Sequence, residues 1–306
     1  MTATLTRPAS PPARAAIPRR HDRERSAAAV LMAPFFVLLV AVFLVPVGTA
    51  VWLSFFGADE PGLGFGPEHT VFVGLRSYVA VLGDPTFRSA LGVIARYCLV
   101  YLPLLVIASL GLALLLDSAA ARLKSVARLG LFLPHAVPGI IAAIIWLYLY
   151  TPGLSPLPLF GDGGIVALPA VVNIALWSNL GYNVVIFYAA LQAVPREVLE
   201  AAVVDGAGPV RTALRIKTPL IRSSVVMVVL FTLIWSLQLF TEPMLLSQST
   251  PVITARFSPS MYIYDAAFTR NNYGLAAAAS VVLLACTIAL SYGVTRWTNR
   301  TREVNP

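Results

Sequence analysis

The stretch EAAVVDGAGPVRTALRIKTP, residues 200–219, is a polar segment in a chain that is otherwise very apolar. It carries five charged side chains, whereas the runs on either side of it, residues 166–194 and 223–241, carry none. About 20 apolar residues in a helix are enough to cross the hydrocarbon core of a bilayer. The segment is therefore expected to be a polar connection between two membrane-spanning segments.

The composition of the whole chain also indicates a membrane protein. Of its 306 residues, 58% are hydrophobic and 12% are charged, and the mean hydropathy is +0.79. Soluble domains carry about 25% charged residues, so this chain has too little polar surface for a soluble globule. Six apolar runs are long enough to span a bilayer, at residues 27–56, 91–116, 129–150, 166–194, 223–241 and 273–295.

A segment surrounded by lipid has to satisfy its own backbone hydrogen bonds, which favours helices. We therefore expect an all-α integral membrane protein with six transmembrane helices. The fourth run is longer than a bilayer requires, so part of it is expected to lie along an interface or to bend near Pro169. Arg96 interrupts the second run and is expected either to extend to the external surface or to pair with an acid of a partner.

Three parts are expected along the chain. Residues 1–26 contain four prolines, six arginines and few large apolar side chains, which predicts a disordered cytoplasmic tail. Residues 27–298 form the six-helix domain, with the polar connection at 195–222, and residues 299–306 form a second cytoplasmic tail. A cleaved signal peptide is the alternative for the amino-terminal part. The first apolar run is about twice the usual length of a signal core, which favours an uncleaved span.

The basic residues predict the orientation of the spans. Seventeen of the 22 Lys and Arg lie in the two tails and in the connections after the second and fourth runs. Four lie in the opposite loops, and Arg96 lies within a run. Cytoplasmic segments carry the excess of Lys and Arg, so both termini and the 200–219 segment are expected to be cytoplasmic. This topology explains the net charge of +8 without a nucleic-acid partner.

The sequence offers no pattern for catalysis or cofactor binding. Cys98 and Cys286 lie inside expected spans, where they are small packing residues, and the three histidines are scattered without carboxylates at ligand spacing. No Gly-x-x-x-x-Gly-Lys-Ser/Thr loop occurs, so the chain is not expected to bind ATP phosphates itself. We expect no catalytic residue, no metal and no cofactor in this chain.

The polar segment is expected to form two short helices with a sharp turn. Pro195 suits the first turn of a helix, and Glu197 and Glu200 then lie near its N-terminus, where negative charge is favoured. Gly206 fits the end of this helix because glycine adopts the left-handed conformation without penalty. Pro219 ends the second helix. The alternative is an ordinary helical connection without a function of its own.

The order of residues in this segment resembles a known loop. Glu200-Ala201-Ala202, three residues, Gly206, nine residues and Ile216-x-x-Pro219 resemble the cytoplasmic coupling loop of permease subunits of binding-protein-dependent ABC importers. Thr218, where the family usually has leucine, departs from the pattern. Further similarity to the carbohydrate-type permeases of this family extends over roughly residues 30 to 295, at residues 72–75, 84–87, 111–116, 132–134, 145–146, 262–264, 267–268 and 274–278.

This resemblance implies the architecture of a type I ABC importer permease in the plasma membrane of a prokaryote. It implies three kinds of partner: a second permease subunit, homologous or identical, two ATPase subunits that bind ATP, and an extracytoplasmic substrate-binding protein. The chain would form the path for a sugar or related polyol by alternating access and would perform no bond chemistry. The resemblance assigns coupling to the ATPase to Glu197, Glu200, Ala201, Ala202, Asp205, Gly206 and Pro219.

Polar residues inside spans are candidates for the substrate path, because burying them in hydrocarbon is costly. The candidates are Asn173, Trp177 and Asn183 in the fourth run, with Asn179 and Tyr182 nearby, and Trp235, Gln238 and Glu242 at the fifth. The last three follow the spacing of one helix face. Amides and a carboxylate can bind sugar hydroxyls, and an indole suits the apolar face of a pyranose. The alternative is that the amides join helices and the tryptophans anchor the protein at the interface.

Other functions stay open on the sequence. An ABC permease for a non-sugar solute fits the same pattern. A self-contained secondary transporter would more often show inverted repeats and buried coupling-ion residues, and a membrane scaffold would not need the Glu200 loop.

Overall fold

The computed structural model describes residues 20–59, 69–118, 124–151, 167–249 and 251–303. The chain divides into two compact units, residues 1–49 and 50–306.

The first unit contains a long apolar helix. α1 (Arg20–Leu39) continues through a π-helical turn, η1 (Val40–Leu44), and is followed by α2 (Val45–Leu53), whose residues 50–53 belong to the second unit. Its large apolar side chains are exposed, with Leu31 at 80%, as expected for a segment that faces lipid or another subunit. The helix begins at Arg20 and so includes residues 20–26 of the expected tail. The earlier residues of the expected tail, 1–19, lie outside the described residues.

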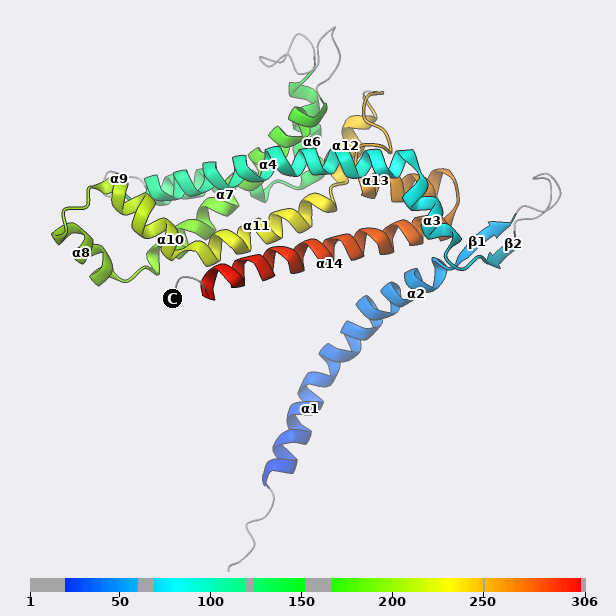
Figure 1. The fold of residues 1–306 in the computed structure, drawn as a ribbon, viewed down its shortest axis with the longest axis horizontal. Helices are drawn as coiled ribbons and strands as arrows, with labels where there is room; N and C mark the ends of the chain where they lie inside the picture. Colours follow the sequence, from blue (N-terminus) through cyan, green and yellow to red (C-terminus); the bar gives the residue numbers. More distant parts are fainter. Residues whose placement is uncertain (1–19, 60–68, 119–123, 152–166, 250, 304–306) are drawn as a thin grey trace, which may run out of the picture. The chain divides into compact units, whose positions relative to one another are not determined.

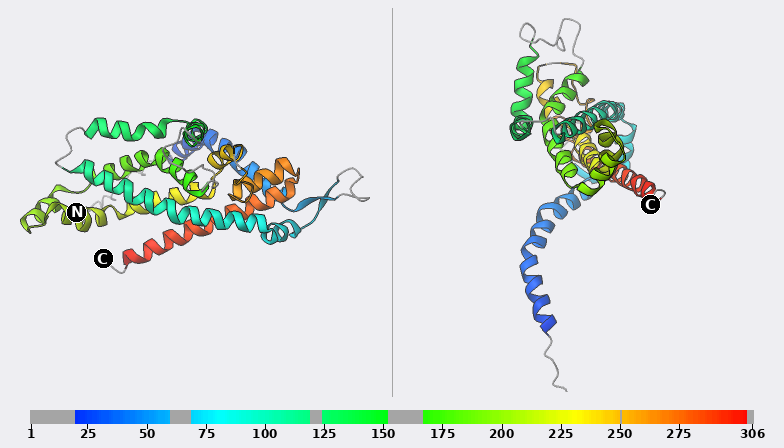
Figure 2. Two further views of the ribbon diagram at one scale, coloured as in Figure 1. Left: turned by 90° about the horizontal axis from the view of Figure 1, so that it is seen from above. Right: turned by 90° about the vertical axis from the view of Figure 1, so that its left-hand side faces the viewer.

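The second unit is a bundle of long helices. α4 (Pro85–Asp117), α7 (Ala167–Gln192), α11 (Arg222–Leu237) and α14 (Tyr273–Glu303) lie alongside one another (Figures 1 and 2). α4 and α7 share the largest contact, where Ile94, Tyr101 and Leu105 are buried together with Ala170 and Ile174. Within the described residues, five helices are long and apolar enough to cross a membrane, or six if one bent pair counts as one span. This confirms the expected helical membrane fold.

The bent pair corresponds to the third apolar run, which the sequence predicted as one transmembrane helix. α5 (Lys124–Phe132) and the 3₁₀ turn η2 (Leu133–Ala136) meet α6 (Gly139–Leu149) at 93°. Pro134 and Pro138 explain the break, because proline lacks a backbone N–H and restricts the residue before it to extended conformations. α5 packs tightly on α7: a Cβ added to Gly181 would lie 1.7 Å from the carbonyl oxygen of Leu131.

Two other runs also differ from expectation. α7 is unbroken, so the bend near Pro169, one of the two alternatives expected for this run, is not present. Pro169 lies in the first turn, where no intrahelical N–H bond is required. The fifth run is interrupted, because α11 ends at Leu237 and α12 (Thr241–Ser247) begins after a short irregular segment. Trp235, Gln238 and Glu242 therefore do not share one helix face as the spacing predicted.

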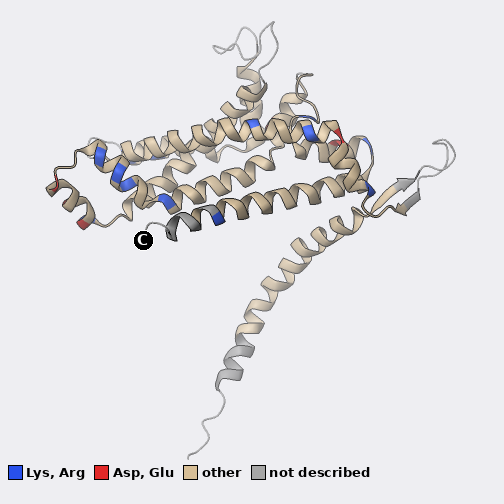
Figure 3. Ribbon diagram, viewed as in Figure 1, with Lys and Arg blue, Asp and Glu red and all other residues tan. Residues whose placement is uncertain are grey.

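The two ends of the bundle carry different structures. At one end, β1 (Phe56–Asp59) and β2 (His69–Phe72) form an antiparallel hairpin beside α3 (Arg76–Gly83), a small departure from the all-α expectation. α13 (Pro259–Tyr264) and η4 (Asp265–Thr269) lie toward the same end. At the other end lie α8 (Arg196–Val204), α9 (Pro209–Arg211), η3 (Thr212–Lys217), α10 (Thr218–Leu220) and the C-terminal end of α14. Most charged residues lie toward the two ends of the bundle, and long stretches of α7 and α11 between them contain none (Figure 3).

Candidate functional site

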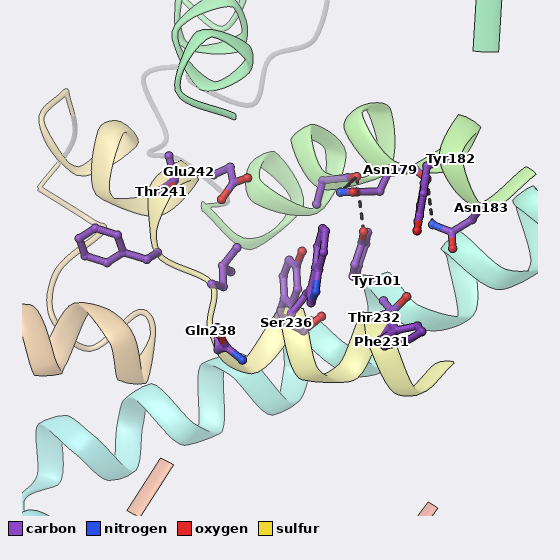
Figure 4. Close-up of a pocket in the computed structure, with 15 residues that line it drawn as sticks. Tyr101, Asn179, Tyr182, Asn183, Phe231, Thr232, Ser236, Gln238, Thr241 and Glu242 are labelled. Atoms are coloured by element: carbon purple, nitrogen blue, oxygen red, sulfur yellow. Dashed lines mark hydrogen bonds between the residues drawn. The ribbon is translucent and has the colours of Figure 1, made fainter. Parts of the chain in front are cut away.

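A cavity of about 470 Å³ lies within the second unit, between α4, α7 and the junction of α11 with α12. Figure 4 shows polar and aromatic side chains from these helices converging on it. The lining residues are Tyr97, Tyr101, Ala175, Asn179, Tyr182, Asn183, Phe231, Thr232, Trp235, Ser236, Gln238, Leu239, Phe240, Thr241 and Glu242.

The structure brings four of the six expected path residues to this cavity, namely Asn183, Trp235, Gln238 and Glu242. The break after α11 turns the last two toward the same space as Trp235. Asn173 and Trp177 do not line the cavity. Asn173 Nδ2 donates to the hydroxyl of Tyr150 at 2.7 Å, and the Trp177 ring packs edge-on against Trp146 at 6.0 Å. Both residues therefore join α7 to the region of α6: Asn173 matches the alternative in which amides join helices, whereas Trp177 packs between helices and was not expected to do so.

Two tyrosines that form an aromatic wall of the cavity were not among the residues expected from the sequence. Tyr97 and Tyr101 project from α4 with their rings stacked at 5.0 Å between centroids. Their spacing of four residues places them on one helix face, which is the signal that could have identified them. Thr232 and Ser236, also four residues apart, present hydroxyls from α11 in the same way.

The cavity is lined by hydrogen-bonding side chains but by no basic side chain. Asn179 and Asn183 use their Nδ2 atoms to donate to backbone oxygens one turn earlier, both at 2.9 Å. The buried Oγ of Ser236 has no nitrogen or oxygen partner among the described residues, and its polar neighbour is the thiol of Cys98, a weak donor. Glu242 is the carboxylate of the lining, and no Lys, Arg or His lines the cavity.

Glu242 also lies close to another helix terminus. Its Oε1 is 3.8 Å from the position of a Cβ built on Gly139, the first residue of α6. Negative charge is favoured near the N-terminus of a helix, where backbone N–H groups lack partners. This location helps to explain how a carboxylate is accommodated inside an apolar bundle.

The polar segment forms a separate candidate site at one end of the bundle. α8 ends in a Schellman motif: the N–H of Ala207 donates to the oxygen of Ala202 at 2.9 Å, and the N–H of Gly206 to that of Val203 at 3.0 Å. Gly206 has φ +73°, the left-handed conformation expected for it. Glu197, Glu200, Ala201 and Asp205 are exposed, whereas Ala202 is buried. Pro219 lies within α10.

The surface of α8 is partly apolar and uncovered. Val203 and Val204 are 69% and 87% exposed at its C-terminal end, next to the Gly206 turn. An apolar helix surface beside charged residues is typical of a protein–protein contact.

A network of charged and aromatic groups lies at the opposite end of the bundle. Asp84 caps α4 by accepting from the backbone N–H of Thr86 at 2.7 Å, and the hydroxyl of Tyr262 donates to its other oxygen at 2.8 Å. Arg270 is 3.8 Å from Asp84 and pairs with Asp265 at 2.7 Å. Burial acts to raise the pKa of Asp84, but the hydrogen bonds from Thr86 and Tyr262 and the nearby Arg270 outweigh it, so this pKa is lowered. Burial and the bond to Asp84 raise the pKa of Tyr262.

Asp84→Asn is expected to lower the thermal midpoint of the detergent-purified protein at neutral pH, because an amide pairs less well with the Thr86 N–H and Arg270. The pKa of Asp84 is lowered on folding from about 3.9, so its stabilisation is complete above that value and is lost as the pH falls through the folded-state pKa. The midpoints of wild type and variant should therefore converge in acid. If the thermal midpoints of wild type and variant differed by the same amount at pH 7 and at pH 3, this role of Asp84 would be contradicted.

Among the described residues, no three His, Cys, Asp or Glu side chains are placed to share a metal ion.

Comparison with known proteins identifies the family. Residues 97–302 match the family described as binding-protein-dependent transport system inner membrane component. The chain is 30% identical over 273 residues to the sn-glycerol-3-phosphate transport system permease protein UgpA of Salmonella choleraesuis, covering 86% of this chain and 90% of the relative. It is 31% identical over 315 residues to the diacetylchitobiose uptake system permease protein NgcF of Streptomyces coelicolor, covering 94% and 87%.

The fold is also similar to that of a solved transporter. A chain of a bacterial ABC transporter involved in the import of the acidic polysaccharide alginate superposes with a TM-score of 0.68 at 18% identity, covering 91% of this chain and 96% of that one. The same kind of transporter in complex with its periplasmic protein bound to an alginate pentasaccharide gives a TM-score of 0.70 at 16% identity, covering 92% and 98%. The match over two thirds of the sequence and the two relatives show that this chain belongs to the family of binding-protein-dependent transport system inner membrane components.

Proposed function

We propose that this chain is the permease subunit of an ATP-driven importer and forms part of the path for a sugar or related polyol by alternating access. The observation that carries the proposal is the cavity between α4, α7 and α11, which combines aromatic rings with amides and hydroxyls inside a membrane bundle. Amide and hydroxyl groups bind sugar hydroxyls, and tryptophan and tyrosine rings pack on the apolar faces of sugar rings.

The charge of the cavity favours a neutral solute. The relatives carry solutes of both kinds, since one is named for sn-glycerol-3-phosphate and the other for diacetylchitobiose. Phosphate and carboxylate groups are commonly bound by Arg or Lys, and neither lines this cavity, which instead contains Glu242. The alternative is a permease for a non-sugar solute. The exposure of Trp235, 63% although it lines the cavity, supports a path completed by a second permease subunit, homologous or identical.

The loop at residues 195–222 is the proposed contact with the ATPase. The exposed Glu197, Glu200, Ala201 and Asp205 and the uncovered valines of α8 would bind one of two ATPase subunits, which bind ATP. Gly206 and Pro219 would shape the two halves of the loop. An extracytoplasmic binding protein would deliver the solute at the opposite end of the bundle, near the β1–β2 hairpin.

This arrangement predicts the orientation of the chain in the plasma membrane of a prokaryote. α8 and the C-terminal end of α14 lie at one end of the bundle (Figure 1), which would be cytoplasmic. Replacing Cys98 and Cys286 with alanine and placing a cysteine at Asn305 tests this. A membrane-impermeant thiol reagent should label Asn305→Cys only after the cells are opened. Labelling in sealed cells would refute the orientation.

The function is tested by purifying the chain together with its partner subunits and reconstituting the complex in liposomes. The complex should hydrolyse ATP, whereas the chain purified alone should not. Uptake is measured for radiolabelled neutral sugars and polyols beside sn-glycerol 3-phosphate, and neutral hydroxylated solutes should be preferred. Preference for the phosphate ester or for a solute without hydroxyls would favour the alternative.

Trp235→Ala is expected to reduce uptake of the preferred solute by about tenfold, because losing one stacking surface in a site costs roughly 1–2 kcal/mol. Tyr292→Ala is the matched control, since it removes an exposed aromatic ring from α14, outside the cavity. It should leave uptake within about twofold of wild type. Equal effects of the two changes would argue against the cavity as the solute path.

A further inference from the structure

One carboxylate joins several elements at the end of the bundle that carries α8. Asp117 is the last residue of α4. Its Oδ2 pairs with the ammonium group of Lys217 in η3, and its Oδ1 accepts from Nε2 of Gln192, the last residue of α7, at 2.6 Å. Lys124 at the start of α5 donates to the backbone oxygen of Asp117 at 3.4 Å. Asp117 and Lys217 are largely buried, with 10% and 18% of their side chains exposed.

The position of Asp117 is unfavourable for α4 itself. The C-terminus of a helix carries partial negative charge, so an acid there is destabilising and a basic residue is preferred. The last turn of α4 contains no basic residue that would offset the charge. The pairing with Lys217, a hundred residues away in sequence, provides the compensation that the helix lacks.

This pairing is a distinctive link between the loop and the membrane helices. Two other side-chain hydrogen bonds of the loop stay within it, from Thr212 to Ala207 and from Thr218 to Ala213. Among the described residues, no other side-chain hydrogen bond or ion pair joins residues 195–222 to the helices of the bundle. An apolar contact lies directly beside it, where Ile221 packs in one buried cluster with Leu116 and Leu191, the neighbours of Asp117 and Gln192.

We propose that Asp117, Lys217 and Gln192, here called the loop junction, fix the second half of the loop to the ends of α4 and α7, so that a displacement of α8 moves the helices that line the cavity. α4 carries Tyr101 about 24 Å from Asp117, at 1.5 Å per residue, and α7 carries Asn183. Rigid helices joined by ion pairs and hydrogen bonds are the kind of element that carries coupling over such a distance. This inference rests on the proposed function, because it requires an ATPase to displace α8.

The test measures movement at the cavity in the complex with its partner subunits. In a background with Cys98→Ala and Cys286→Ala, the exposed Gln238 is replaced by cysteine and its reaction rate with a fluorescent methanethiosulfonate reagent is measured. The rate is compared between nucleotide-free protein and protein trapped with ATP and vanadate. Asp117→Asn and Lys217→Met should each reduce the nucleotide-dependent change by about tenfold. The ATPase should still copurify, because α8 is unaltered.

Two further variants separate a loss of pairing from a loss of folding. Lys217→Arg and the exchange Asp117→Lys with Lys217→Asp should each recover most of the response, since both restore opposite charges. Arg296→Met removes a cation at the C-terminal end of α14 and should respond as wild type does. If the two single variants kept the wild-type response, the loop junction would be refuted. It would also be refuted if the restoring variants did not recover that response. A wild-type complex without ATPase or nucleotide response would instead contradict the proposed function.

Discussion

Gly181→Ala should prevent α5 from packing on α7 and lower the yield of folded protein severely. The added Cβ would lie 1.7 Å from the oxygen and 2.3 Å from the carbon of the Leu131 carbonyl, and 2.9 Å from the nitrogen of Phe132. These atoms belong to the backbone, so no side-chain rotation can relieve the overlap. Overpacking of a core costs about 1–3 kcal/mol or more, and a clash with a helix backbone belongs at the upper end of that range.

The consequences should extend to the cavity. The contact at Gly181 holds the bent span against α7, where the ring of His135 stacks on that of Tyr182 at 4.6 Å and Arg128 lies over the ring of Tyr188 at 4.7 Å. Tyr182 lines the cavity. Displacing α5 would therefore move a wall of the proposed solute path as well as destabilise the bundle.

The measurement is the monodisperse yield and thermal midpoint in detergent, beside Gly111→Ala. Gly111 lies in α4 and has no heavy atom within 4 Å of an added Cβ. Alanine is favoured over glycine in a helix by about 1 kcal/mol, so this control should be as stable as wild type or more stable. A Gly181→Ala protein with wild-type yield and midpoint would show that α5 and α7 are not in close contact.

The contrast between Gly181 and Gly206 shows how far the sequence predicts this fold. Gly206 follows a helix-forming stretch and precedes Gly208-Pro209, so local preferences predict its role as a helix stop. Nothing in the residues around Gly181 indicates that another backbone approaches it, because that contact comes from α5, some 50 residues earlier. Local sequence predicts local conformation, whereas close approach depends on tertiary packing.

The residues that line the cavity could be predicted only in part, because some of them are brought together by tertiary packing. Polar residues within apolar runs indicated Asn183, Trp235, Gln238 and Glu242, since their burial needs an explanation. The interruption after Leu237 was not predicted, although Pro243 is a sequence signal for it: in a continuous helix the proline could not bond to the carbonyl of Leu239, and its ring would clash with that group. Asn173 and Trp177 are similar in polarity to the lining residues, but they face α6. Only the packing of the helices determines whether such a residue faces the cavity or a neighbouring helix.

Gly206→Val should abolish most uptake while leaving the membrane helices folded. Gly206 has φ +73°, where side-chain residues are disfavoured by about 1–2 kcal/mol and β-branched residues by more. No heavy atom lies within 4 Å of an added Cβ, so the effect would come from backbone strain and not from a clash. Relief of that strain would break the bonds from Gly206 and Ala207 that end α8 and would turn its exposed residues away from the proposed ATPase contact.

Gly208→Val is the matched control two residues away. Gly208 also has no heavy atom near an added Cβ, but its φ of −67° and ψ of 163° are extended and suit a β-branched residue before Pro209. Gly206→Val should reduce uptake and ATPase copurification by about tenfold or more, since a loss of 1.4 kcal/mol or more is expected. Gly206→Asn should be milder because asparagine tolerates this conformation, and Gly208→Val should behave as wild type. If Gly206→Val kept normal uptake and ATPase binding, residues 195–222 would not be the coupling loop.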